Sequence, residues 1–107
     1  MADVLKLYSG RAFLGGRAVA HRVRTEAVRL LASRSDSVVV LDFEGVDGVS
    51  HSFGDELLSP LAELLDQAVA KRVKLANCSA STLADLRSVA DMHRLPMPHV
   101  CAEVVAA

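Results

Sequence analysis

The segment that most constrains the fold is residues 38–43, Val-Val-Val-Leu-Asp-Phe, which is apolar at every position except Asp42. The consecutive valines favour an extended backbone, because β-branched side chains pack well on a pleated surface. A nearly continuous apolar run of this kind is typical of a strand that is covered on both faces. We therefore expect residues 38–43 to form the central strand of a sheet.

Amphipathic helices are predicted before and after this strand in the sequence. After Gly15 and Gly16, apolar residues recur every three or four positions as far as Leu31, which predicts a helix with a basic outer face. A second helical pattern covers residues 53–69 and has an acidic outer face. Pro60 lies inside this pattern and is expected to kink the helix or to divide it there. The outer face of the first helix is expected to carry Arg17, Arg22, Arg24 and Arg29.

Further strands and one more helix complete the predicted order of elements. Strands are expected at residues 4–8, 11–14, 73–78 and 99–105, and the last helix is expected to begin with a cap at Ser81 or Thr82. Strands that alternate with helices imply a parallel sheet with right-handed crossovers. A chain of 107 residues is the usual size of one domain, so we expect residues 1–107 to fold as a unit.

Charge and composition exclude several classes of function. Residues 1–34 carry seven Lys or Arg against two acids, whereas residues 35–70 carry eight acids and no Lys or Arg. Nucleic-acid binding is not expected, because the chain has only one tyrosine and three phenylalanines to intersperse with its basic residues. There is no long apolar run and no leader pattern, and Cys78 and Cys101 form no close pair, so we expect a cytoplasmic protein with reduced thiols and no membrane contact.

A resemblance appears where the central strand leads into the acidic helix. Residues 41–58 contain Leu-Asp-Phe, then Gly-Val, Val-Ser and Ser-Phe-x-Asp-Glu-Leu. This stretch resembles the bacterial STAS-like family, whose function is largely unassigned and which is similar to the anti-sigma-factor antagonists. In those antagonists the strand leads into Asp-Ser-Ser-Gly and the next helix. Aligned without gaps, Ser50-His51-Ser52 covers Asp-Ser-Ser, and Ser52 takes the place of the serine that partner kinases phosphorylate.

The resemblance implies a fold and a class of function. The fold would be a STAS-like α/β domain with a mixed sheet of four or five strands and about three helices, mainly on one side of the sheet. The N-terminal strand would lie at an edge of the sheet, and an antiparallel orientation of this strand is one alternative. The function would be non-enzymatic, namely regulatory binding to another protein such as an anti-sigma or kinase-type ATPase. The acidic surface is expected to dock on a basic patch of that partner through Asp47, Ser50, His51, Ser52, Asp55, Glu56 and Ser59.

Ser52 has two interpretations that are compatible with each other. It is expected to cap the second helix in the sequence Ser52-Phe53-Gly54-Asp55, and it is also the candidate phospho-acceptor. Asp55 and Glu56 are expected in the first helical turn, where their charges would oppose a phosphate on Ser52. Adjacent helical residues point about 100° apart, so these two carboxylates are not expected to form a catalytic acid/base pair.

No residue pattern points to catalysis, a cofactor or a metal. His51 is expected to be an exposed turn residue, and the spacing of His93, His99 and Cys101 matches no familiar zinc motif. One alternative function is a module that binds a small ligand or nucleotide at the start of the second helix. Another is a structural homodimer in which the basic first helix pairs with the acidic second helix of another copy.

Overall fold

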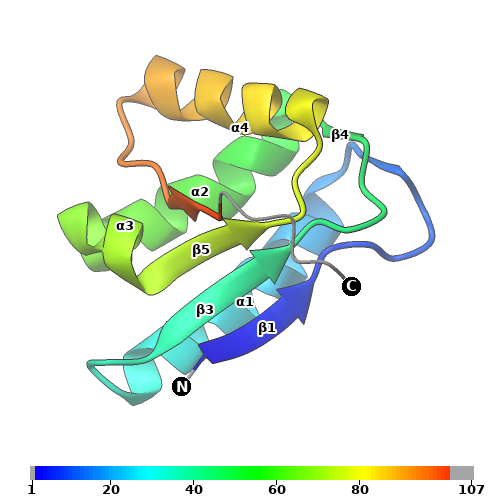
Figure 1. Ribbon diagram of the computed structural model, residues 1–107. Helices are drawn as coiled ribbons and strands as arrows, with labels where there is room; N and C mark the ends of the chain where they lie inside the picture. Colours follow the sequence, from blue (N-terminus) through cyan, green and yellow to red (C-terminus); the bar gives the residue numbers. More distant parts are fainter. Residues whose placement is uncertain (1, 102–107) are drawn as a thin grey trace.

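A four-stranded parallel sheet organises the molecule (Figure 1). The computed structural model describes residues 2–101. The strands are β1 (Ala2–Lys6), β3 (Val38–Asp42), β5 (Val73–Ala76) and β6 (His99–Val100), in the spatial order β1-β3-β5-β6. Residues 38–42 therefore form an inner strand, as predicted, between β1 and β5.

Three long helices and one short helix accompany the sheet. They are α1 (Arg17–Ser33), α2 (His51–Leu65), α3 (Val69–Arg72) and α4 (Ala80–His93), and a 3-10 turn, η1 (Asp66–Ala68), joins α2 to α3. Figure 1 shows α1 and α2 behind the sheet, and α4 packed over α2. Within the described residues, no helix is both long and apolar enough to cross a membrane.

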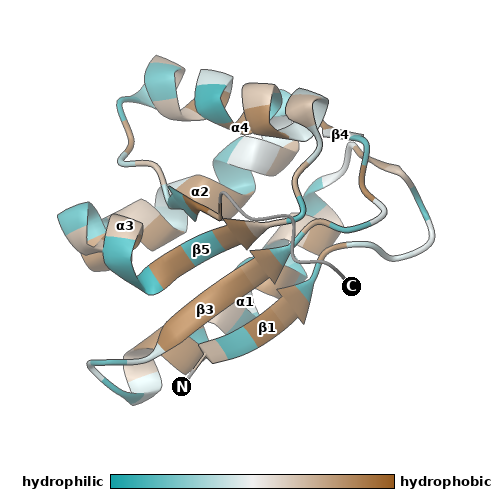
Figure 2. Ribbon diagram, in the orientation of Figure 1, coloured by the Kyte–Doolittle hydropathy of each residue, from teal (hydrophilic) through white to brown (hydrophobic). Residues whose placement is uncertain are grey.

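Among residues 2–101, helices cover only one face of the sheet. Val39 and Leu41 of β3 and Leu75 of β5 point into the core and are fully buried, whereas Val40 between them is only half-buried. On the same open face, Val4 of β1 is 56% exposed. For the described residues, the expectation that β3 is covered on both faces is therefore wrong, although Figure 2 shows that most of the strand is hydrophobic. Its open-face valines are partly shielded by the neighbouring strands instead of by a helix.

Three expectations about strands need correction. Every pairing in the sheet is parallel, including that of β1 with β3, so the sheet is not mixed and the edge strand β1 is not antiparallel. A second, two-stranded parallel sheet pairs β2 (Phe13–Leu14) with β4 (Gly48–Val49), and β4 lies inside the segment predicted as a turn. The last predicted strand is represented by β6, and residues 102–105 lie outside the described residues.

Helix boundaries also differ from the prediction. α2 is continuous through Pro60, because the leucines on both sides of the proline are buried and hold the helix in place. α4 begins earlier than expected, since the hydroxyl of Ser79 accepts a hydrogen bond from the Thr82 backbone N–H at 3.0 Å. The caps expected at Ser81 or Thr82 were therefore wrong. Gly15 and Gly16 join β2 to α1, and Gly16 is the N-cap residue of α1.

Gly54 allows α2 and α4 to approach closely, and this contact can be tested. A Cβ at residue 54 would lie 2.8 Å from Cγ2 of Val89. We expect Gly54→Ala to lower the free energy of unfolding by about 1 kcal/mol, because overpacking outweighs the gain in helix propensity. Urea denaturation measures this loss. In the double variant with Val89→Ala, the total loss should be about 1 kcal/mol smaller than the sum of the two single losses. Strictly additive losses would show that the contact between residue 54 and Val89 does not determine how closely α2 and α4 pack.

Candidate functional site

The start of α2 is fixed to the β2–α1 turn by Ser50. The Ser50 hydroxyl accepts a hydrogen bond from the Phe53 backbone N–H at 3.1 Å and donates one to the Gly15 carbonyl at 2.9 Å. Its backbone N–H donates to the Leu14 carbonyl at 3.0 Å. Ser50 is therefore the N-cap of α2, and the prediction that Ser52 is the cap was wrong because the helix begins two residues earlier.

Ser52 occupies the second position of α2 and is half-buried. Relieved of the capping role, its hydroxyl makes no hydrogen bond to any of residues 2–101. The backbone N–H groups of the first helical turn and the helix dipole favour a negative charge at this position. Ser52, the candidate phospho-acceptor, thus lies in the first turn of α2.

Glu56 is bound inside the chain and faces α1. Its carboxylate accepts hydrogen bonds from Nη1 of Arg17 at 3.1 Å and Nη2 of Arg24 at 2.9 Å, and its side chain is 21% exposed. The hydrogen bond from Arg24, and next that from Arg17, lowers the pKa of Glu56 against the opposing effect of desolvation. Arg17 and Arg24 of α1 are therefore paired with Glu56 of α2 within one chain, whereas Arg22 of α1 and Glu63 of α2 are exposed.

Asp55 points in a different direction from Glu56. Its Oδ1 accepts a hydrogen bond from the Ser59 hydroxyl at 2.6 Å and lies 3.8 Å from Nε2 of His93 on α4. The two carboxylates thus contact different neighbouring helices, which confirms that they do not share one site. Both lie in the second turn of α2, so the expected first-turn acids are absent from the described helix start.

The turn before α2 presents exposed side chains around a short strand. Asp47 is exposed, while its backbone N–H donates to the Ala12 carbonyl at 2.7 Å and its carbonyl accepts from the Ser79 hydroxyl at 2.9 Å. The ring of Phe13 on β2 lies against Gly48 and Gly15, and this side chain is 59% exposed. The turn is therefore fixed in its backbone and accessible in its side chains.

His51 is exposed, as predicted, but it has a partner that the sequence did not indicate. Its Nε2 lies 3.1 Å from Nε2 of His93, at the end of α4. His93 lies close to His99 and Cys101 in the sequence, but those two residues lie on or directly after β6. Residues 51 and 93 are far apart in the chain, and only the packing of α4 on α2 brings them together.

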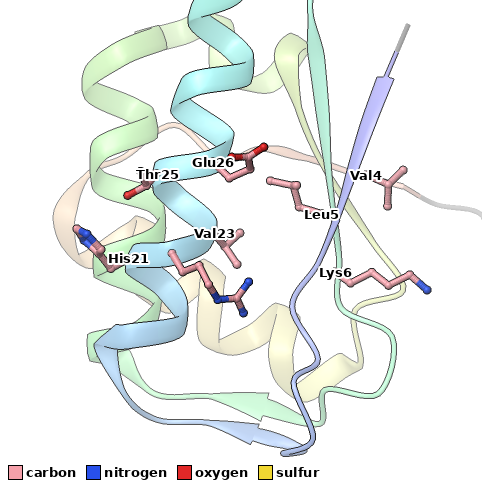
Figure 3. A pocket seen from close by; sticks show the side chains of 8 residues that line it. Val4, Leu5, Lys6, His21, Val23, Thr25 and Glu26 are labelled. Carbon is pink, nitrogen blue, oxygen red and sulfur yellow. The ribbon is translucent and has the colours of Figure 1, made fainter.

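One large surface hollow lies away from this site, and another borders it at Asp47. The larger, of about 600 Å³, lies between β1 and α1, and Figure 3 shows Leu5 and Val23 on its two sides. The other, of about 540 Å³, lies at the carboxyl ends of β3 and β5, where ligands commonly bind to parallel sheets. Burial raises the pKa of the Cys78 thiol in this second hollow to about 11, so the thiol is protonated at neutral pH and is a poor nucleophile.

These features define an α/β domain in which a parallel sheet leads through an exposed turn into a capped helix. A family model described as a STAS-like domain of unknown function (DUF4325) matches residues 19–83, more than half of the chain. The chain belongs to this family, which confirms the resemblance noted in residues 41–58. Comparisons with curated proteins and with solved structures find no match.

Proposed function

We propose that the chain is a non-enzymatic regulatory module that binds another protein through the 47–52 turn and the start of α2. The observation that carries this proposal is the Ser52 hydroxyl, which lies at a helix start without a hydrogen bond to the described residues. Asp47 and His51 flank it with exposed side chains. By resemblance to the anti-sigma-factor antagonists, the partner would be an anti-sigma or kinase-type ATPase that phosphorylates Ser52.

The charges around Ser52 in the folded chain oppose a phosphate less than the sequence indicated. A phosphate on Ser52 would lie near the free N–H groups of the first turn, which attract a dianion. The carboxylate of Glu56, one turn further on, is neutralised by Arg17 and Arg24. The opposing charge is therefore mainly that of Asp55, which is directed towards α4.

The contact surface is smaller than the one predicted from the sequence. Glu56 is bound by two arginines of its own chain, and the Ser50 hydroxyl is occupied as the helix cap. The proposed contact uses Asp47, His51 and Ser52, together with Asp55 and Ser59, whose side chains are hydrogen-bonded to each other. Free cysteines at positions 78 and 101 agree with a reducing compartment, and the proposal places the protein in the cytoplasm.

Affinity capture of the chain from its own cells, with phosphate mapping by mass spectrometry, tests this proposal. We expect wild-type protein to retain a kinase-type ATPase or anti-sigma protein and to carry phosphate on Ser52. Ser52→Asp, which mimics the modified state, should retain at least about tenfold less partner, because a charge introduced into an interface costs about 1.4 kcal/mol or more. Ser88→Ala, an exposed serine on α4, is the matched control and should behave as wild type. Equal capture by Ser52→Asp and wild type would contradict the proposal.

The hollow at the carboxyl ends of β3 and β5 supports a second candidate function, the binding of a small ligand. Its rim carries Glu44 and Asp47, which disfavour a phosphate and favour an uncharged or basic ligand. A bound ligand raises the melting temperature by mass action. Thermal-shift screening with nucleotides and with amines would therefore separate the two kinds of ligand, and no shift with any compound would remove the candidate.

A further inference from the structure

The outer edge of β1 carries backbone groups that have no strand beside them. β1 pairs with β3 on one side, and within residues 2–101 no strand pairs with its other side. The Leu7 backbone N–H, directly after β1, donates to the Asp42 carbonyl at 2.9 Å and so points towards β3. Because successive residues of a parallel strand bond to alternate sides, the backbone N–H and C=O groups of Val4 and Lys6 point outwards. β1 therefore presents an unpaired hydrogen-bonding edge.

The hollow of about 600 Å³ between β1 and α1 lies directly against this edge. It is lined by Val4, Leu5 and Lys6 of β1 and by a part of α1 that includes Arg22 and Val23. Figure 3 shows Leu5 directed towards α1, whereas Val4 and Lys6 extend to the other side of β1. Val4 and Lys6 therefore border the hollow through the edge of the strand. Leu5 and the buried Val23 make the inner part of the hollow apolar.

The charged groups around this hollow leave a positive charge available. Glu26 of α1 accepts hydrogen bonds from the Arg29 guanidinium, and these bonds lower the pKa of Glu26, so its negative charge is compensated within the chain. Arg22 is exposed, and it forms no ion pair with any of residues 2–101. The hollow therefore favours a ligand that carries a carboxylate next to an apolar group.

We propose that an extended segment of another protein binds to the outer edge of β1 as a fifth strand of the four-stranded sheet. The backbone of this segment would pair with the outward groups of Val4 and Lys6, and every second side chain would point into the hollow. An apolar side chain fits against Leu5 and Val23, and an acidic side chain fits beside Arg22. The side chains of the segment that face the hollow would therefore be apolar and acidic.

A second copy of the chain fits this edge less well. Pairing of β1 with another β1 about a twofold axis would bring two α1 helices to the same face of the extended sheet. Each helix would carry an Arg22, and like charges across an interface disfavour binding. The inference is independent of the partner proposed above, because no residue of α2 or of the 47–52 turn lines the hollow.

A synthetic peptide of about ten residues with blocked ends tests the site. Valine and glutamate alternate on the side of the peptide that would face the hollow, and threonine occupies every other position. Titration into the isotope-labelled chain, followed by NMR spectroscopy, should show saturable binding. The outward amides of Val4 and Lys6 should exchange with solvent at least about tenfold more slowly in the complex. The Leu7 amide is already bonded to Asp42 and should change little, so it is the internal control.

Two pairs of variants separate the backbone contribution from the charge. Lys6→Pro removes one outward N–H and keeps the hydrogen bonds to β3, since an edge strand tolerates proline, and it should weaken peptide binding about tenfold. Lys6→Ala keeps this N–H and should bind as wild type. Arg22→Ala should weaken binding about two- to fivefold. Arg87→Ala removes an exposed arginine from α4 and should leave the affinity unchanged. Circular dichroism checks that each variant is folded.

The proposal predicts one pattern, and other patterns overturn it. No binding of the peptide at millimolar concentration would show that the edge does not accept a strand. Equal affinities of Lys6→Pro and Lys6→Ala, or unchanged exchange of the Val4 and Lys6 amides, would show that the peptide binds elsewhere. Slow exchange of these amides in the free chain that increases with protein concentration would assign the edge to a second copy. Wild-type affinity in Arg22→Ala would contradict the acidic character of the segment.

Discussion

Phe53→Ala is expected to lower the free energy of unfolding by about 4 kcal/mol. Phe53 is fully buried at 0% exposure, in the first turn of α2, and packs into the core cluster that α2 and the sheet share. Alanine would leave a cavity that the surrounding helices fill only in part. Urea denaturation followed by circular dichroism measures the loss as a shift of the midpoint.

Phe13→Ala is the matched control for this substitution. It removes the same side chain from β2, where the ring is 59% exposed, and should cost about 1 kcal/mol or less. If Phe53→Ala does not fold, the conservative Phe53→Leu should fold with a loss of less than about 1.5 kcal/mol. Similar losses for Phe13→Ala and Phe53→Ala would contradict the buried position of Phe53.

Arg72→Ala is expected to lower the free energy of unfolding by about 2–3 kcal/mol. Arg72, the last residue of α3, extends its guanidinium to the C-terminal end of α1. Its Nε donates to the Ser37 carbonyl at 3.0 Å, and its Nη2 lies 2.7 Å from the Leu31 carbonyl and 2.6 Å from the Arg34 carbonyl. These carbonyls would lose the guanidinium donors, so that Leu31 and Arg34 keep only the contacts from Ser37, and the helix end would lose a favourable positive charge.

Two variants show whether this effect belongs to the guanidinium. Lys71→Ala, at the exposed neighbouring position, should change the stability by less than about 0.5 kcal/mol. Arg72→Lys keeps the charge but loses the planar set of donors, so it should recover only part of the loss. Full recovery by lysine would show that charge alone stabilises this end of α1. An effect of Arg72→Ala no larger than that of Lys71→Ala would contradict the proposed role.

The sequence predicted the elements that depend on local patterns. The valine-rich run at residues 38–43 became β3, because consecutive β-branched residues favour an extended, buried strand. The spacing of Val23, Ala27 and Leu31 predicted the buried face of α1. Coverage of only one face of β3 was not predictable, since neighbouring strands can shield apolar side chains as well as a helix can.

The errors at the candidate site arose from contacts between distant segments. Ser50 and Ser52 are both suitable caps, and the choice of Ser50 depends on the Gly15 carbonyl, 35 residues away in the chain. The pairing of Glu56 with Arg17 and Arg24 likewise depends on the packing of α2 against α1. The charge block in the sequence therefore did not indicate that Glu56 is paired within the chain, whereas Asp47, Glu63 and Asp66 of the same block are exposed.

The position of Phe13 makes the site optically observable. Its ring is exposed on β2 and lies against Gly48 and Gly15. The Gly15 carbonyl accepts a hydrogen bond from the hydroxyl of Ser50 at the start of α2. The chain contains no tryptophan. An indole placed at position 13 would thus be the single strong fluorophore in the molecule, and its emission would report, without any attached label, when another molecule covers the turn or when the helix start changes its charge.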